Sequence, residues 1–126
     1  MVIYLTEGSM EHQSRIRDAI SSRPGWEFGV SPLVQLECLV SPKRSGDLSL
    51  ESRYMAVLAQ MLMLPFDEVT WVRATELRAR FGLKTPDALH LACAQINGCR
   101  EFWTNDDRLS RAAMGLSLNL FRIAAS

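Results

Sequence analysis

Blocks of hydrophobic and polar residues along this chain predict helices separated by short strands. Apolar residues recur at the three- and four-residue spacing of helices over 9–21, 33–40, 50–63, 67–80 and 86–96, with a further helix at 108–114. Short runs rich in β-branched and aromatic residues predict strands at 2–5, 26–30, 102–104 and 116–123, and a polar turn is expected over 41–48. Strands that alternate with helices in this way predict an α/β protein with a mainly parallel sheet.

The most hydrophobic of these helices follows Lys84. Thr85 is a suitable N-cap, and Pro86 suits the first helical position because that position needs no backbone N–H. Residues 88–96 are apolar nearly all round, which is typical of a buried helix. Asp87 is therefore expected in the first turn of a central helix, at the mouth of the core. An acid there also stabilises the helix through its dipole, by about 0.3–1 kcal/mol, so a purely structural role for Asp87 is equally open.

A second carboxylate lies in the helix that is predicted to begin after Ser31. Leu33, Leu36, Glu37 and Val40 fall at positions i, i+3, i+4 and i+7, so Glu37 is expected on the apolar face. A buried carboxylate is costly unless it meets a partner charge, hydrogen bonds or a metal ion. A salt bridge to an arginine of the same domain is the alternative to a metal ion.

A third group of acids follows a predicted strand. Asn105, Asp106 and Asp107 come directly after the aromatic run at 102–104. Open parallel sheets bind their ligands at the carboxyl ends of the strands. One of the three residues is expected to cap the next helix, which leaves an acid for another role.

Composition limits the possible functions. The 126 residues are 48% hydrophobic and 22% charged, as in an ordinary globular domain, and 14 basic residues balance 14 acidic ones. A nucleic-acid partner would therefore need a local basic patch. Cys38, Cys93 and Cys99 form no C-x-x-C pair, and with two histidines a zinc site is not expected. The lack of a signal sequence and of a long apolar run predicts a cytoplasmic protein without a membrane span.

Glu37, Asp87 and Asp106 are the candidate site residues. A set of carboxylates without histidine or cysteine suits a hard cation, Mg²⁺ or Mn²⁺, and we expect the three to converge around one such ion. Bound ions of this kind activate water and neutralise charge on a phosphate. No G-x-x-x-x-G-K or G-x-G-x-x-G loop is present, which disfavours nucleoside triphosphate and dinucleotide binding.

Three segments together resemble the PIN domains, and among these the VapC-like toxin ribonucleases of toxin–antitoxin systems. The segments are Ser31–Val40, Leu83–Ala92 and Phe102–Leu109, within a similarity that covers almost the whole chain as one domain, 1–126. The resemblance implies a three-layer sandwich with a mainly parallel central sheet flanked by helices. It implies a metal-dependent endoribonuclease that hydrolyses phosphodiester bonds of RNA such as tRNA, with Glu37, Asp87 and Asp106 as catalytic Mg²⁺ or Mn²⁺ ligands. A cognate antitoxin and a second copy of the chain are the implied protein partners.

The amino end departs from the family's pattern. Members usually open with a strand that runs into Asp-Thr-Asn, whose aspartate is a principal metal ligand, and Val2–Leu5 is not followed by that motif. Either Thr6 stands in place of the aspartate, or Val2–Gly8 matches the segment just after the motif and the usual first strand is missing; the second alignment fits better. Impaired activity is expected, and a catalytically inactive module that binds an antitoxin or RNA is the alternative. A receiver-like domain phosphorylated on aspartate is disfavoured, because the acids do not form an early pair beside a lone acceptor.

Overall fold

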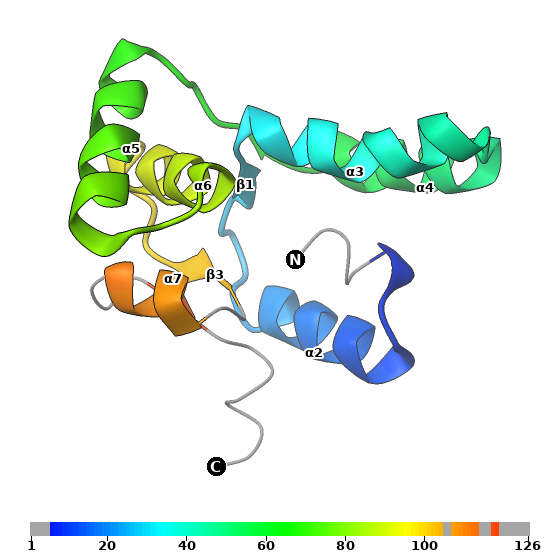
Figure 1. Ribbon diagram of the computed structural model, residues 1–126. Coiled ribbons are helices and arrows are strands. Elements are labelled where there is room, and N and C mark those ends of the chain that lie inside the picture. The colour runs from blue at the N-terminus through cyan, green and yellow to red at the C-terminus, as the bar shows by residue number, and fades with distance from the viewer. Residues whose placement is uncertain (1–5, 105–106, 114–116, 119–126) are drawn as a thin grey trace. The chain divides into compact units, whose positions relative to one another are not determined.

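The computed structural model describes residues 6–104, 107–113 and 117–118, and the chain forms two compact units, residues 1–63 and residues 64–126. Figure 1 shows the elements in chain order. The strand predicted at 2–5 lies outside the described residues, as does Asp106. Of the strand predicted at 116–123, only residues 117–118 are described, and they are extended.

The first unit is a helical hairpin with a small parallel strand pair. It contains, in chain order, α2 (Met10–Ser21), β1 (Gly29–Val30), α3 (Pro32–Ser45), α4 (Leu48–Ala59) and β2 (Leu62–Met63). β1 pairs in parallel with β2, so that Gly29 lies opposite Leu62 and Val30 opposite Met63. The helices α3 and α4 pack against each other (Figure 1). Their shared core consists of Val30, Cys38, Leu39, Tyr54 and Leu58.

The polar turn predicted over 41–48 is wrong, because α3 continues through Pro42 to Ser45. Pro42 is buried, and this packing offsets the hydrogen bond that proline cannot donate within a helix. The helix ends at Gly46, whose backbone is left-handed (φ 71°, ψ 22°) and whose N–H returns to the Pro42 carbonyl. Asp47 then caps α4 by accepting a hydrogen bond from the Leu50 N–H at 3.0 Å.

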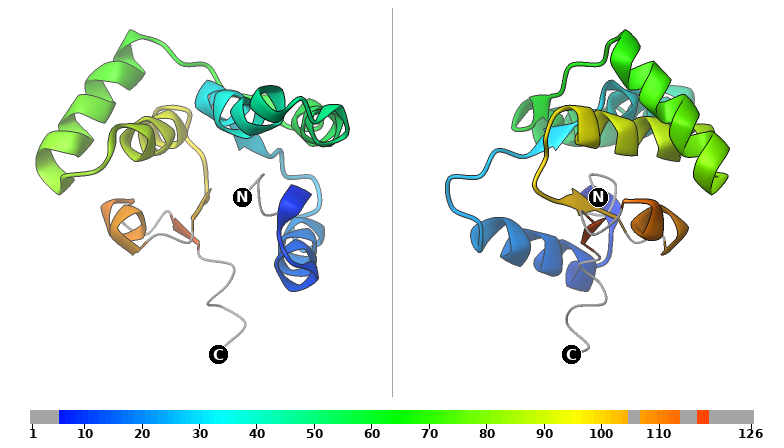
Figure 2. Two further views of the ribbon diagram at one scale, coloured as in Figure 1. Left: turned by 45° about the vertical axis from the view of Figure 1, so that its right-hand side comes forward. Right: turned by 90° about the vertical axis from the view of Figure 1, so that its left-hand side faces the viewer.

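The second unit contains a pair of packed helices and a second parallel strand pair. Its elements are α5 (Glu68–Phe81), α6 (Thr85–Ile96), β3 (Phe102–Trp103), α7 (Asp107–Ala112) and β4 (Ser117–Leu118). β3 pairs in parallel with β4, and α5 packs against α6 (Figure 2). Six of the 12 residues of α6 are buried, in the apolar stretch that the sequence predicts to be inside, and these are Ala88, Leu89, Leu91, Ala92, Cys93 and Ala94. The α/β class and the parallel pairing of strands are confirmed.

The hydrophobic spacing of α5 favours an inward face with Val69, Val72 and Leu77, and with Trp71 as a further member, but only Leu77 of these is buried. Val69, Trp71 and Val72, the large apolar residues near its start, are 54–57% exposed. The buried residues are Thr70, Ala74 and Leu77. The side of α5 that carries these three residues is therefore the buried one, although two of them have small side chains. Among the described residues, no helix is both long and apolar enough to cross a bilayer.

The α5–α6 core gives a direct stability prediction. Leu91 is fully buried, so Leu91→Ala should lower the free energy of unfolding by about 3 kcal/mol through lost burial and a residual cavity. Val72→Ala, on the exposed side of α5, is the matched control and should cost well under about 1 kcal/mol. Urea denaturation measures both values, and an equal loss in the two variants would contradict this packing.

Candidate functional site

Asp87 lies where the sequence predicts it, in the first turn of α6, and its side chain is half-buried. The helix begins one residue earlier than predicted. Lys84 is the N-cap, no side chain caps the helix, and Thr85 and Pro86 are its first two residues, so the predicted capping role of Thr85 is wrong. Pro86 is tolerated one position further in because first-turn N–H groups have no partner within the helix. The first backbone bond runs from the Ala88 N–H to the Lys84 carbonyl at 3.0 Å.

The turn that leads into α6 is held by hydrogen bonds from α5. Gly82, in the left-handed conformation (φ 65°, ψ 28°), ends α5 and donates its N–H to the Arg78 carbonyl at 2.9 Å. The Arg78 side chain donates from Nε to the carbonyl of Leu83, also at 2.9 Å, and the Leu83 side chain is buried. The start of α6, and with it the backbone of Asp87, is therefore fixed within the second unit.

Glu37 lies in α3, which begins as predicted, with Ser31 as N-cap and Pro32 as first residue. The prediction that Glu37 lies on a buried apolar face is wrong, because Glu37 is exposed, as are Leu36 (65%) and Val40 (42%). The buried stripe of α3 is shifted by one residue, to Cys38, Leu39 and Pro42. Packing against α4 selects that stripe. The cost of a buried carboxylate is thus no argument for a metal ion at Glu37, and the family resemblance alone supports that role.

A contact that sequence reasoning missed lies close to α3. The Tyr54 hydroxyl donates a hydrogen bond to the carboxylate of Glu7, and the Arg53 guanidinium donates to the Thr6 carbonyl. These residues are 47 positions apart, so no local pattern could have indicated the contact.

Burial raises the pKa of the Cys38 thiol to about 11, and the negative charges of Glu37 and Glu7 add to this rise.

Cys38 and Cys93 are buried packing residues, and Cys99 is half-buried. Burial raises the pKa of Cys93 to about 11, with a smaller contribution from Cys99, and burial also raises the pKa of Cys99. Thiols with raised pKa values stay protonated near neutral pH, and a protonated thiol is a poor nucleophile and a poor metal ligand.

Convergence of the three predicted site residues stays a prediction. Glu37 belongs to the first unit and Asp87 to the second, and Asp106 precedes α7 outside the described residues. Within the described ranges, no three acidic, histidine or cysteine side chains come together as a metal site. By chemistry the predicted donors do fit a hard divalent cation, since all three are carboxylates and the one at Asp87 is half-buried on a fixed helix start.

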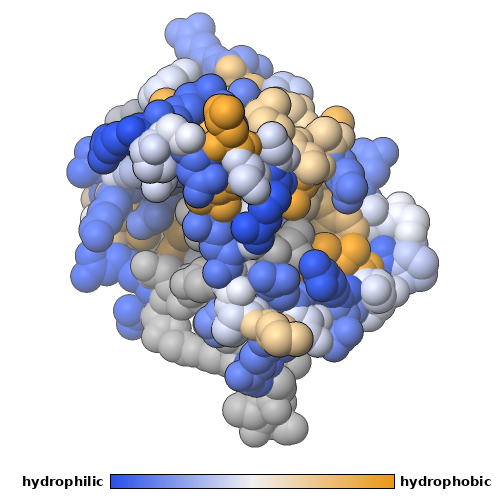
Figure 3. Space-filling model, turned by 90° about the vertical axis from the view of Figure 1, so that its right-hand side faces the viewer, coloured by the Kyte–Doolittle hydropathy of each residue, from blue (hydrophilic) through white to orange (hydrophobic). Residues whose placement is uncertain are grey.

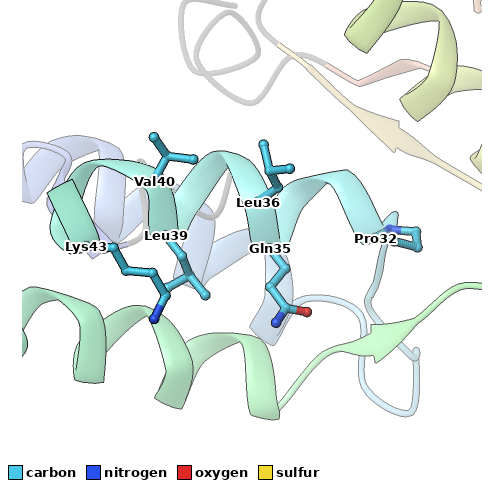
Figure 4. A pocket seen from close by; sticks show the side chains of 6 residues that line it. All are labelled: Pro32, Gln35, Leu36, Leu39, Val40 and Lys43. Carbon is cyan, nitrogen blue, oxygen red and sulfur yellow. The ribbon is translucent and has the colours of Figure 1, made fainter.

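A shallow groove runs along α3 (Figure 4). It is lined by Pro32, Gln35, Leu36, Leu39, Val40 and Lys43. Figure 4 shows Leu36 and Val40 pointing to one side of the helix, while Leu39 and Lys43 point toward α4. Lys43 forms an ion pair with Glu51 of α4. Figure 3, which faces the side where the α3–α4 hairpin turns, likewise shows hydrophobic residues at the surface among hydrophilic ones.

Comparisons with known proteins agree with the family resemblance of the sequence and with the α/β fold. A family model described as the PIN domain matches residues 1–114. Among solved structures, a chain of a "Toxin-antitoxin complex from Klebsiella pneumoniae" has a similar fold, with a TM-score of 0.75. The two chains are 23% identical, and the match covers 94% of this chain and 91% of that one, so the likeness concerns the fold. No curated protein matches the sequence.

Proposed function

We propose, since this chain belongs to the PIN domain family, that it is a divalent-metal-dependent endoribonuclease and the toxin of a toxin–antitoxin pair, acting in the cytoplasm. PIN domains are generally nucleases and typically use divalent metal ions. One observation carries the proposal. Asp87, a half-buried acid on a fixed helix start, lies inside the region that matches the family, in a segment where the family resemblance places a metal ligand.

Glu37, Asp87 and Asp106 are the residues that would hold Mg²⁺ or Mn²⁺. Such an ion, when bound, neutralises charge on the scissile phosphate and makes a bound water more acidic. The chain's own contribution begins at α6, where the α5–α6 turn holds the backbone of the helix start that carries Asp87. Lys84, exposed at the N-cap of the same helix, places a positive charge three residues away, where an RNA phosphate would enter.

Binding of RNA is proposed to rely on a local basic rim, because the formal net charge of the chain is zero. The basic residues near the proposed acids in sequence are Lys43, Arg44, Lys84 and Arg108, and all four are exposed. Lys43 already pairs with Glu51, which reduces its part in such a rim. Lys84 and Arg108, both in the second unit, are the stronger candidates for phosphate contacts.

Replacing Lys84 and Arg108 together with alanine should weaken RNA binding and flatten its dependence on salt. Each lost phosphate contact lowers the slope of log K against log salt concentration by about one unit, so the double variant should lose about two. The measurement is RNA affinity at several salt concentrations. Arg17→Ala, an exposed arginine of α2, is the control and should leave the slope unchanged. A double variant with the wild-type slope would place the RNA elsewhere.

The protein partners are proposed from the family resemblance and the exposed surface of α3. Leu36 and Val40 give the α3 groove an apolar lining that suits apolar side chains of an antitoxin. The neighbouring fold comes from a toxin-antitoxin complex, which supports a partner of this kind. A homodimer, with a second copy of the chain, is part of the same proposal.

A second candidate function is a PIN-like module that binds an antitoxin or RNA without catalysis. The observation in its favour is that Thr6-Glu7 follows the run Val2–Leu5, where one of the two alignments places the family's Asp-Thr-Asn. The two candidates differ when the chain is incubated with RNA and Mg²⁺ or Mn²⁺, with EDTA as control. Cleavage that EDTA stops, even slow cleavage, supports the ribonuclease. RNA binding without cleavage, also after the motif is added, supports the module.

A further inference from the structure

Two consecutive residues of α4 contact two consecutive residues near the start of the chain. Arg53 donates a hydrogen bond to the backbone carbonyl of Thr6, and Tyr54 donates one to the carboxylate of Glu7. Thr6 and Glu7 are helical and precede α2, and all four residues belong to the first unit. The pair of contacts therefore fastens residues 6–7 to α4 at two adjacent points.

Tyr54 also belongs to the core that contains α3. Its side chain is 1% exposed and lies in the same buried cluster as Cys38 and Leu39, which directly follow Glu37. A buried phenol requires a hydrogen-bond partner, and Glu7 is the partner of this one. The Tyr54 hydroxyl thus contacts residues 6–7, while the Tyr54 ring packs in the core of α3, the helix that carries Glu37.

The residues that follow this connection are held as well. The Gly8 carbonyl accepts a hydrogen bond from the Gln13 side chain at 3.0 Å. Ser9 caps α2 by accepting from the His12 N–H at 3.1 Å. The path from residue 6 into α2 is therefore fixed at both ends, with α4 on one side and the first turn of α2 on the other.

We propose that Arg53 and Tyr54 form a positioning clamp that sets residues 6–7 in place relative to α3 and hence relative to Glu37. The inference rests on the proposed function in one respect. Glu37 is a proposed metal ligand, and residues 2–8 resemble the family segment that follows the first metal-binding aspartate. The clamp residues touch neither the ion nor the RNA. They act through the backbone of residues 6–7 and through the packing of α3.

The test compares Tyr54→Phe, Glu7→Ala and the double variant in the full chain. Phenylalanine keeps the buried ring and removes the hydroxyl, so the α3–α4 core should stay intact. Amide hydrogen exchange at residues 6–9 is expected to become about tenfold faster in each single variant, while the amides of α5 and α6 stay unchanged. Because both substitutions remove one interaction, the double variant should exchange no faster than the faster single one. Unchanged exchange at residues 6–9, or additive effects, would overturn the clamp.

Conservative variants and controls separate the clamp from general destabilisation. Glu7→Gln keeps an acceptor oxygen for the Tyr54 hydroxyl and should restore near-normal exchange, whereas Glu7→Ala should not. Arg53→Ala should speed exchange at the same amides, and Arg17→Ala, which removes an exposed arginine of α2, should not. Fast exchange in Glu7→Gln as well would show that the Tyr54 contact does not hold this segment.

Titration with Mn²⁺ distinguishes positioning from a purely structural role. Tyr54→Phe is expected to weaken Mn²⁺ binding by about tenfold, as for residues that orient metal ligands, and Arg17→Ala should leave it unchanged. Faster exchange with wild-type Mn²⁺ affinity would overturn the positioning role. If the wild-type chain binds no Mn²⁺ at all, the proposed function is wrong. The exchange rates at residues 6–9 in the single and double variants then decide whether Arg53 and Tyr54 hold this segment.

Discussion

Replacing Asp87 with asparagine is expected to lower metal-dependent RNA cleavage by at least about a hundredfold, more than the loss of a residue that only supports a metal ligand. Asparagine keeps the size of the side chain and one oxygen but removes the negative charge that a hard cation requires. Cleavage rates of wild type and variant with saturating Mn²⁺ measure the effect. Asp18→Asn, an exposed acid of α2, is the matched control and should cleave at the wild-type rate.

The same variant separates the metal role of Asp87 from its effect on the helix. If the three carboxylates share one site, removing one charge without metal relieves repulsion, so the apo protein should be as stable as wild type or more stable. If Asp87 acts only through the helix dipole, stability should fall by about 0.3–1 kcal/mol, and cleavage should persist. Thermal unfolding in EDTA measures this difference. A variant that unfolds without metal would show that the structural role of Asp87 dominates.

Adding a strand that ends in Asp-Thr-Asn ahead of Val2 is expected to raise cleavage strongly, by about a hundredfold or more relative to the chain as printed. A metal held by three acids instead of four loses an anionic ligand, which weakens both metal affinity and the positioning of the attacking water. Glu7, the nearest acid, accepts a hydrogen bond from the Tyr54 hydroxyl, which makes it a poor substitute ligand. The measurement is RNA cleavage by the two chains at equal Mn²⁺ concentration.

A control for this prediction is an extension that ends in Asn-Thr-Asn, which should leave cleavage at the low level of the unextended chain. Glu7→Gln should have little effect in either chain, because glutamine still accepts the Tyr54 hydrogen bond. Equal, metal-dependent cleavage by the extended and unextended chains, with Glu7→Gln fully active, would show that a different set of residues forms the site.

Local sequence signals predicted the boundaries of α2, α5 and α6 to within one residue, but not the end of α3, although Gly46 caps it. The helices predicted at 67–80 and 9–21 are α5, which Asp67 and Gly82 cap, and α2, which Ser9 caps. Asp87 likewise lies in the first turn of α6 because Pro86 and the apolar run after it fix the helix start to within one residue. These predictions depend on backbone hydrogen bonds within a few residues, which the local sequence determines.

The faces of the helices could not be predicted in the same way. The apolar pattern of α3 favoured the stripe through Leu36 and Val40, whereas packing against α4 buries the stripe through Cys38 and Leu39. In α5, Thr70 and Ala74 are buried, whereas the larger apolar residues near the helix start are exposed. Both helices carry more apolar residues than one buried face uses, so the tertiary partner decides. The Tyr54–Glu7 contact could not be predicted from the sequence either, because it joins two residues that are 47 positions apart.

The most direct test of the central claim is the position of Mn²⁺ in crystals of this chain, located by its anomalous scattering. The claim is that one divalent ion is held by Glu37, Asp87 and Asp106. It predicts a single Mn²⁺ with carboxylate oxygens of all three residues at about 2.0–2.6 Å. Mn²⁺ bound elsewhere, or any of the three carboxylates more than about 10 Å from the other two, well beyond a shared coordination shell, would contradict it.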